Sequence, residues 1–283
     1  MRPGYSCIIP TRDRRAMVQE AVATVLAQER PAAEIIVVDD GSRDDTMARL
    51  AARFPQIRLV RLDGRGPGPA RNAGVAAASA EVLMFLDSDD HWRPDHAGRL
   101  LAVLERGFAV AYGPTHNIDQ VSGGEFAIPA PGEEIEGDCF AALLRWCFLV
   151  PSSVAVTRAA FHRCGGFSSG ELGEDWVFFL KLAGIYPFGF AAGPPLTTRR
   201  LHRESLCRLV DPDRLIAGLR HLETLFDPES DVGRPLLPPE LARRRQARER
   251  FAALARWTEA RAGAAGWASI QEWYLALRRE KMV

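Results

Sequence analysis

The 283-residue sequence lacks any excess of charge, because 36 Lys and Arg residues balance 36 Asp and Glu residues. A dedicated nucleic-acid-binding protein is usually strongly basic, so this balance argues against that class of partner. The sequence also lacks the roughly 18 consecutive apolar residues that suggest a transmembrane helix, and its first apolar run is too short for a signal peptide. Disorder is excluded because 47% of the residues are hydrophobic, enough for a folded core.

Paired cysteines are missing as well. The five cysteines are an odd number at irregular spacings and form no CxxC pair, so the sequence indicates neither a zinc site nor a redox dithiol. We therefore expect reduced thiols in a cytoplasmic protein. Lysine is also scarce, with only Lys181 and Lys281, a bias typical of a GC-rich genome rather than of a function.

Residues 1–112 alternate short apolar runs with helical patterns. The segment EIIVVD at Glu34–Asp39 has the β-branched core of a strand buried on both faces. Strands are expected at Tyr5–Pro10, Glu34–Asp39, Ile57–Arg61, Glu81–Asp87 and Phe108–Tyr112. Helices are expected at Arg14–Gln28, from a capping box of Ser42 and Asp45 to Arg53, at Pro69–Ser79, and from Pro94 to Arg106. This rhythm predicts an α/β fold with a mostly parallel, Rossmann-like sheet flanked by helices.

The remaining sequence changes character twice. Residues 113–137 are rich in Gly, Pro and acidic residues and predict a surface loop or a short hairpin. Short helices are expected at Cys139–Trp146 and Thr157–Cys164 around the apolar segment LVPSSVAV, then a helix at Glu174–Ala183 and a strand at Tyr186–Ala192. Beyond Pro195 the pattern is helical and Arg-rich, without a strand signal, at Asp211–Phe226, Pro239–Ala262 and Ala268–Arg279. We therefore divide the chain into two halves of one domain, residues 1–112 and 113–205, and a helical C-terminal extension, residues 206–283.

Acidic clusters follow two of the expected strands. Asp39 and Asp40 end one strand, and Asp87, Asp89 and Asp90 follow another. Ligands bind outside the carboxyl ends of the strands in open α/β sheets, so both clusters lie where a ligand is expected. Three carboxylates within four residues suit a hard divalent cation. Asp, Gly and Ser are also common turn residues and helix caps, and this alternative stays open.

The order and spacing of several segments resemble family 2 glycosyltransferases. The segments SCIIPTRDRR, EIIVVDDGSRDDT, GPARNAG and LMFLDSDDHW resemble the N-terminal half of that family. A later segment, VTRAAFHRCGGFSSGELGEDWVFFLKLA, looks like its acceptor half, and the whole resemblance covers roughly residues 5–205. It implies the GT-A fold and an enzyme that transfers a sugar from a nucleoside diphosphate sugar to an acceptor nucleophile with inversion.

The resemblance assigns the donor site to the ends of the strands. Thr11, Arg12 and either Asp39 or Asp40 resemble the positions that hold the base and ribose, and a carboxylate that accepts the imide proton of uracil favours UDP. Arg71 falls where the family often has a basic residue near the nucleotide, although a surface ion pair is the alternative. The expected nucleotide-sugar-binding residues are Pro10, Thr11, Arg12, Asp13, Asp39, Asp40, Arg71, Asp87, Ser88 and Arg200.

A divalent cation, Mn²⁺ or Mg²⁺, is implied by the same resemblance. Asp87 and Asp89 look like the family's metal-diphosphate motif, with Asp89 as the direct ligand, and the cation would neutralise the departing diphosphate. Asp90 is similarly placed, or else it caps the following turn. Some family members have a histidine at the position of His202 that completes the metal site, and Arg199, Arg200 and Arg203 would add donors for phosphate oxygens. An isolated structural histidine is the alternative.

Glu174 and Asp175 resemble the family's paired acidic motif, in which the aspartate is the catalytic base. An inverting displacement needs a carboxylate opposite the leaving group to take the proton of the acceptor. The alternative is that the two acids only favour the start of a helix through its macrodipole.

Other enzyme classes agree less well with the sequence. Gly64–Gly68 does not complete the G-x-G-x-x-G pattern, and PTRDRR follows the first strand, which disfavours a dinucleotide-dependent dehydrogenase. A sugar nucleotidyltransferase would need a Gly-rich basic loop after that strand, and a phosphatase with an aspartyl nucleophile would need Thr or Val where His91 stands. A non-catalytic relative that binds nucleotide sugars stays open.

The charge balance conceals two unlike parts. Residues 1–195 hold 19 basic and 24 acidic groups, whereas residues 196–283 hold 17 and 12. The Arg-rich C-terminal helices are expected either to present a solvated face or to contact an anionic membrane or lipid-diphosphate acceptor peripherally, at the inner face of the membrane. Phe251, Leu254 and Trp257 would pack inward or across a homodimer. The acceptor itself stays unspecified: a glycan, a lipid-linked sugar, a metabolite and a protein all fit.

Overall fold

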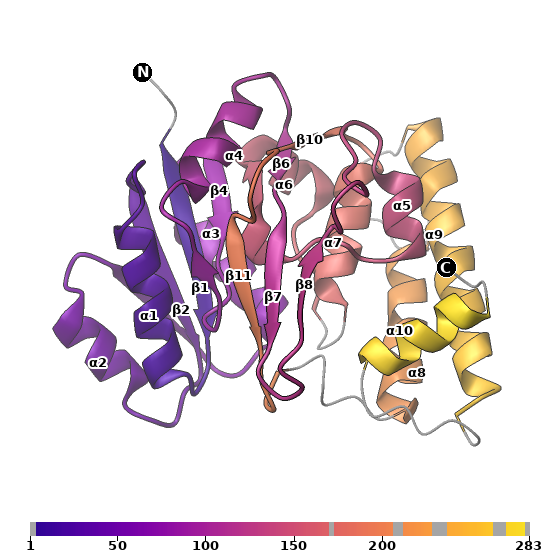
Figure 1. The fold of residues 1–283 in the computed structure, drawn as a ribbon, viewed down its shortest axis with the longest axis horizontal. Coiled ribbons are helices and arrows are strands. Elements are labelled where there is room, and N and C mark those ends of the chain that lie inside the picture. Colours follow the sequence, from indigo (N-terminus) through magenta and orange to yellow (C-terminus); the bar gives the residue numbers. More distant parts are fainter. Residues whose placement is uncertain (1–3, 170–172, 206–211, 228–236, 263–269, 281–283) are drawn as a thin grey trace.

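The computed structural model describes residues 4–169, 173–205, 212–227, 237–262 and 270–280 (Figure 1). The expected starts of two C-terminal helices, Asp211 and Ala268, lie outside these ranges.

A seven-stranded sheet forms the centre of the molecule, in the order β10-β6-β9-β4-β1-β2-β3. Only β9 runs antiparallel to its neighbours β4 and β6, so the prediction of a mostly parallel sheet is confirmed. The strands are β1 (Tyr5–Thr11), β2 (Glu34–Asp40), β3 (Arg58–Leu62), β4 (Val82–Phe85), β6 (Val110–Tyr112), β9 (Val154–Thr157) and β10 (Phe188–Phe190).

A smaller four-stranded sheet, in the order β5-β11-β7-β8, stands beside the carboxyl end of β4. Its strands are β5 (His91–Trp92), β7 (Thr115–Asp119), β8 (Glu125–Ile128) and β11 (Thr197–Leu201). Strands β7 and β8 form an antiparallel hairpin, which confirms one of the two predictions for residues 113–137. Strand β11 was not predicted, because TTRRL has no continuous apolar run and only its two end residues are buried.

Helices cover both faces of the large sheet. Successive residues of a strand point to opposite faces, so neighbouring residues of one strand contact different sets of helices. Ile8 belongs to a core cluster with residues of α3 (Pro67–Ala77), α6 (Arg158–Cys164) and α7 (Glu174–Ala183). The next residue, Ile9, belongs to a second cluster with α1 (Arg15–Leu26), α2 (Thr46–Arg53) and α4 (His96–Leu104). Both isoleucines are fully buried, as expected for strands covered on two sides.

One predicted helix start was wrong. Helix α2 begins at Thr46, and the side chain of its N-cap residue, Asp45, makes no capping hydrogen bond. The Ser42 hydroxyl instead accepts a hydrogen bond from the Asp13 N–H at 2.9 Å, and Asp44 accepts from the Thr46 N–H at 3.0 Å. The loop after β2 is therefore used to join β1 and β2 at their carboxyl ends rather than to cap α2.

The C-terminal helices pack against the remainder of the chain. They are α8 (Pro212–Leu225), α9 (Pro238–Glu259) and α10 (Ile270–Arg279), and α5 (Phe140–Arg145) and the 3₁₀ turn η1 (Pro151–Ser153) complete the helices (Figure 1). Phe251 and Leu254 of α9 are fully buried in the same core cluster as Phe178 of α7, so they pack inward. No helix within the described ranges is long and apolar enough to cross a membrane. The division at residue 205 stays a prediction.

Candidate functional site

The carboxyl ends of β1, β2 and β4 lie side by side at one edge of the large sheet. Thr11 ends β1, Asp39 and Asp40 end β2, and the Asp87–Asp90 turn follows β4. Strand β11 ends just before His202, and helix α7 begins at Glu174. The fold therefore brings together acidic side chains from segments far apart in the sequence.

Thr11 and Asp39 are direct neighbours across β1 and β2. Asp39 is fully buried, and its Oδ1 accepts a hydrogen bond from the Ser42 N–H at 3.3 Å. Its Oδ2 and the Thr11 hydroxyl are both buried without a hydrogen-bond partner. Because a buried polar atom without a partner is unfavourable, the two atoms suit a ligand that brings its own hydrogen-bonding groups.

Two other predicted donor-site residues, Asp40 and Asp13, hold loops in place. Asp40 accepts hydrogen bonds from the N–H groups of Arg65 and Gly66, both at 2.7 Å, and so fixes the loop before α3. Asp13 adopts a positive φ of 51° and accepts from the Arg43 N–H at 2.7 Å. Arg12 is half-exposed, and its Nε lies 3.9 Å from the Asp13 carboxylate. Pro10 is buried within β1, and Ser88 is buried within the Asp87–Asp90 turn.

The Asp87–Asp90 turn is fixed by Ser152, which sequence reasoning did not single out. Its hydroxyl donates to Asp90 at 2.6 Å and accepts from the Asp87 N–H at 3.0 Å. Asp90 is almost fully buried, and burial together with the charges of Asp89 and Asp87 raises its pKa well above the ordinary value. These contacts place Asp90 inside the turn, in agreement with the alternative structural role considered for it.

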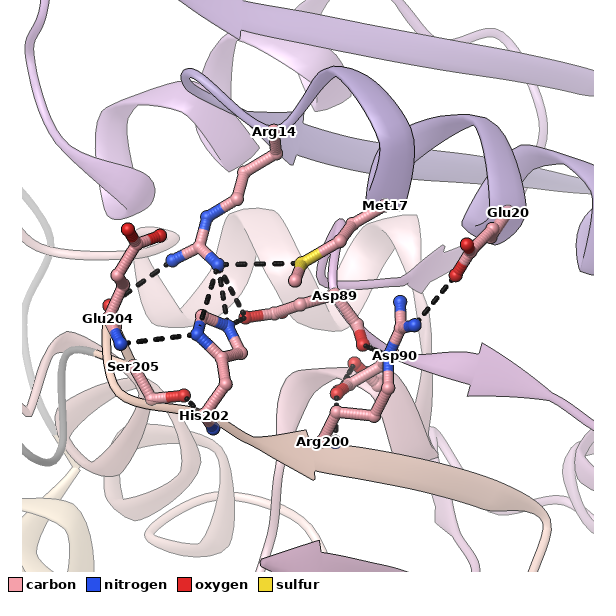
Figure 2. Close-up of polar contacts among 10 residues, drawn as sticks. Arg14, Met17, Glu20, Asp89, Asp90, Arg200, His202, Glu204 and Ser205 are labelled. Atoms are coloured by element: carbon pink, nitrogen blue, oxygen red, sulfur yellow. Dashed lines mark hydrogen bonds and ion pairs between the residues drawn. The ribbon is translucent and has the colours of Figure 1, made fainter. Parts of the chain in front are cut away.

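Arg200 supports the same turn from β11. Its Nε donates to the Asp89 carbonyl at 2.5 Å, its backbone N–H donates to Asp90 at 3.3 Å, and its NH1 donates to Glu20 of α1 at 2.6 Å (Figure 2). The guanidinium thus points toward α1. Arg199, one residue earlier on β11, points to the opposite face because side chains of a strand alternate.

Arg71 lies between two carboxylates that come from distant segments. Its guanidinium donates to Asp87 at 2.6 Å and to Glu174 at 2.8 Å, and the Arg71 side chain is 5% exposed. It also lies over the ring of Phe167, 5.1 Å from the ring centroid. The alternative of a surface ion pair is wrong only in its location, because the ion pair is present but the Arg71 side chain is buried. A contact of Arg71 with the nucleotide stays a prediction.

Glu174 and Asp175 begin α7 beside this ion pair. Burial raises the pKa of Glu174 to about 7, helped by the adjacent charge of Asp175 and opposed by Arg71. Burial also raises the pKa of Asp175, against the charges of Arg71 and Arg199. One Asp175 oxygen accepts a hydrogen bond from the Trp176 N–H at 2.7 Å. A half-buried carboxylate with a raised pKa is a stronger proton acceptor than an exposed one.

Asp89 and His202 meet on the other side of the turn. The His202 Nε2 lies 3.0 Å from the Asp89 Oδ2, and the side chains are 10% and 22% exposed. Figure 2 shows the guanidinium of Arg14, at the start of α1, directed at the same pair. Its NH1 lies 2.5 Å from the His202 Nε2 and 3.8 Å from the Asp89 Oδ2. Arg14 lies within the resembling segment SCIIPTRDRR, but the sequence alone assigned it no role.

The side chains at this point fit a divalent cation in part. No group of three or more His, Cys, Asp or Glu side chains lies together as a metal site in the part of the chain that the structure describes. Asp89 and His202 form a pair, whereas Asp87 is turned toward Arg71. A carboxylate and an imidazole are suitable donors, and Mg²⁺-like cations commonly take one or two protein ligands and complete their shell with water and substrate phosphates. The pair therefore fits a cation bound together with a diphosphate.

Comparison with protein families decides the class of the protein. The family model for glycosyl transferase family 2 matches residues 6–150, just over half of the 283 residues. The chain belongs to this family. This match confirms the family membership that the sequence motifs predicted.

Curated relatives are similar over part of the chain. An uncharacterized glycosyltransferase of Nostoc sp. is 32% identical over 169 residues, which cover 56% of this family 2 glycosyltransferase and 52% of the relative. The succinoglycan biosynthesis protein ExoO of Rhizobium meliloti is 42% identical over 123 residues, which cover 42% and 34%. The matches therefore span about half or less of the length of these two relatives.

Solved structures share the fold at low identity. TarS of S. aureus, in complex with UDP-GlcNAc, matches with a TM-score of 0.63 and 18% identity over 88% of this chain and 71% of that one. The mannosyltransferase PcManGT of Pyrobaculum calidifontis, in complex with GDP-Man and Mn²⁺, matches with a TM-score of 0.58 and 19% identity over 99% and 80%. The predicted GT-A fold of this family 2 glycosyltransferase is thereby confirmed.

Proposed function

We propose that this protein transfers a sugar from a nucleoside diphosphate sugar, with UDP as the favoured nucleotide, to a hydroxyl of a saccharide acceptor, with inversion and with a divalent cation. The observation that carries the proposal is that the Asp89–His202 pair and the Glu174–Asp175 pair lie on two sides of one turn, joined through Asp87 and Arg71. One pair suits the leaving diphosphate, and the other suits the acceptor.

The proposed nucleotide position is at Thr11 and Asp39. The Thr11 hydroxyl and the Asp39 Oδ2 lie on neighbouring strands without a hydrogen-bond partner, and Arg61 lies 4.0 Å from Oδ2. They can accept the imide N–H of uracil and bond a second polar edge of the base. Guanine also carries an imide-type N–H, so the comparison of UDP with GDP in the binding test decides the preference. TarS and PcManGT are named with UDP-GlcNAc and GDP-Man, which supports a nucleotide-sugar donor without choosing between the bases.

In the proposed reaction, the Asp175 carboxylate takes the proton of the acceptor hydroxyl. The acceptor oxygen forms a bond to the anomeric carbon from the side opposite the diphosphate, and the electron pair of the breaking bond leaves on the diphosphate. Glu174 is held by Arg71 and keeps the first turn of α7 in place. A cation at Asp89 and His202 would supply Lewis-acid stabilisation of the diphosphate charge.

The acceptor is proposed to be a saccharide because the relative ExoO is named for succinoglycan biosynthesis. A lipid-linked sugar would place the enzyme at the inner face of the membrane. The exposed arginines of α9, such as Arg245 and Arg256, would then face the anionic surface.

The test begins with thermal shift of the whole chain against UDP, GDP and NAD, each with Mn²⁺ or with chelator, because a ligand of the folded state raises the midpoint. We expect the largest shift with UDP and Mn²⁺. Labelled sugar transfer from the best donor to saccharide acceptors follows, with Asp175→Asn beside the wild type. The variant should keep the donor shift and lose transfer by about 10³-fold or more. A shift with NAD alone, or full transfer by Asp175→Asn, would refute the proposal.

A further inference from the structure

Arg14 is a cation directed at the predicted metal ligands. Its side chain is 17% exposed, and the NH1 group lies 2.5 Å from the His202 Nε2 and 3.8 Å from the Asp89 Oδ2. NH1 also contacts the Met17 sulfur at 3.6 Å, and NH2 donates to the Glu204 carbonyl at 3.2 Å (Figure 2). The proposed function gives this side chain no part, although it occupies the position where a bound cation would contact the same two residues.

The hydrogen bonds of His202 cannot all be satisfied while Arg14 is there. Its Nε2 faces both an Arg14 N–H and an Asp89 carboxylate oxygen. If Nε2 carries a hydrogen, it donates to Asp89 and opposes the Arg14 N–H; if it does not, it accepts from Arg14 and opposes the carboxylate. The Glu204 N–H, 3.2 Å from Nδ1, favours the first tautomer.

A divalent cation would contact the same two side chains as Arg14 does. The lone pairs of Nε2 and of the Asp89 carboxylate would both point at the cation, and Nδ1 would then carry the hydrogen and no longer accept from the Glu204 N–H. Arg14 and the cation would then carry like charges in one small space. Both cannot contact Asp89 and His202 at the same time.

We propose that Arg14 competes with the divalent cation for Asp89 and His202, and that the diphosphate of the donor relieves the competition by drawing the guanidinium away. This inference rests on the proposed function. Guanidinium groups bind phosphate oxygens in paired hydrogen bonds, so a diphosphate at this edge is a better partner for Arg14 than the occupied His202 Nε2. Metal and donor therefore bind cooperatively, each raising the affinity for the other by the same factor.

The experiment measures the Kd of Mn²⁺ by the loss of its free-ion electron paramagnetic resonance signal, with and without UDP. In the wild type, UDP should tighten Mn²⁺ binding strongly. In Arg14→Met, Mn²⁺ alone should bind about tenfold tighter than in the wild type, because a charge-assisted contact no longer has to be broken. The factor by which UDP tightens Mn²⁺ binding should shrink correspondingly. Arg14→Gln gives a second uncharged variant, and thermal melting identifies which variants are folded.

Arg15→Met is the matched control. It removes the same formal charge one residue away, but Arg15 is half-exposed and pairs with Asp45 at 2.9 Å, so Mn²⁺ binding should not change. Unchanged Mn²⁺ affinity in folded Arg14→Met and Arg14→Gln would overturn the competition while leaving the proposed function intact. Equal tightening by Arg15→Met would also overturn it, since a general charge effect would then explain the result. Absence of Mn²⁺ binding by the wild type with UDP would instead refute the proposed metal site, and this inference with it.

Discussion

Arg71 and Glu174 form an ion pair of 2.8 Å although they are 103 residues apart in the chain, and their side chains are 5% and 9% exposed. The same guanidinium holds Asp87 at 2.6 Å. One buried cation therefore fixes the turn after β4 and the start of α7 relative to each other, and their geometry depends on it.

Removing the guanidinium of Arg71 should destabilise the protein severely. In Arg71→Met, the buried Glu174 and the partly exposed Asp87 would both lose their partner, and the free energy of unfolding should fall by about 3–5 kcal/mol. Urea denaturation measures the difference. Arg49→Met is the control, because Arg49 is 61% exposed in its 2.8 Å pair with Asp45 and should contribute less than about 1 kcal/mol. Similar losses in both variants would contradict the assignment of a buried bridge.

The raised pKa of Glu174 predicts a pH dependence of stability. Burial and the charge of Asp175 raise this pKa from 4.5 to about 7, so the folded state binds the proton more tightly than the unfolded chain does. The stabilisation is fully present below about pH 4.5 and is lost as the pH rises through about 7. Glu174→Gln lacks this proton, so the wild type should lose stability relative to the variant between these pH values. Urea denaturation across that range tests the sign, and parallel curves for the two proteins would show that the shift is absent.

Gly68 allows the close approach of α3 to Ser168 and to the first residue of α7. A Cβ there would lie 2.2 Å from the Ser168 carbonyl and 3.3 Å from the Glu174 Cγ. Gly68→Ala should therefore lower the free energy of unfolding by about 1–3 kcal/mol. Gly98→Ala is the matched control, because Gly98 lies in α4 with no atom within 4 Å of its Cβ position, and alanine should stabilise by about 0.5–1 kcal/mol. Opposite signs in thermal or urea unfolding are expected, and a loss of stability in both variants would point to a cause other than the contact with Ser168.

Asp39 and Asp40 are adjacent but should respond differently to substitution. The buried Oδ2 of Asp39 has no hydrogen-bond partner and only the Arg61 guanidinium at 4.0 Å, whereas both oxygens of Asp40 accept backbone hydrogen bonds. Asp39→Asn should weaken UDP binding about tenfold or more in calorimetry while leaving the melting temperature nearly unchanged. Asp40→Asn should lower the melting temperature because one backbone N–H loses its acceptor. If instead Asp40→Asn alone weakened UDP binding, the base would have to lie elsewhere.

The sequence predicted those parts of the fold that are set by local pattern. Apolar runs such as EIIVVD predicted the central strands, and the alternation with helices predicted the parallel sheet. Strand β11 escaped detection because TTRRL has no apolar run, and the Glu20 partner of Arg200 lies 180 residues away, where no local pattern records it. The antiparallel β9 was likewise hidden within an apolar segment whose pairing with β4 and β6 depends on the whole sheet.

The sequence predicted those site residues that directly follow a strand. It did not predict the residues that act by holding another residue in place. The acidic residues at the ends of β2 and β4 were singled out by position. Ser152 and Arg14 were not, because a serine in an apolar segment and an arginine at a helix start carry no distinctive signal. Likewise, the sequence could not separate Arg199 from Arg200, since only the placement of β11 determines which of the two points toward α1.

Helix α7 carries Glu174 and Asp175 at one end and is enclosed by aromatic side chains on two sides. The Trp176 ring meets Phe251 of α9 edge-on with a centroid distance of 5.0 Å, and Phe178 stacks on Phe167 at 4.0 Å. The position of Glu174 and Asp175, the proposed catalytic pair, thus depends on a helix near the end of the chain. An exchange of C-terminal segments between related enzymes should therefore preserve activity only when the new segment supplies an aromatic ring against Trp176 at the position of Phe251.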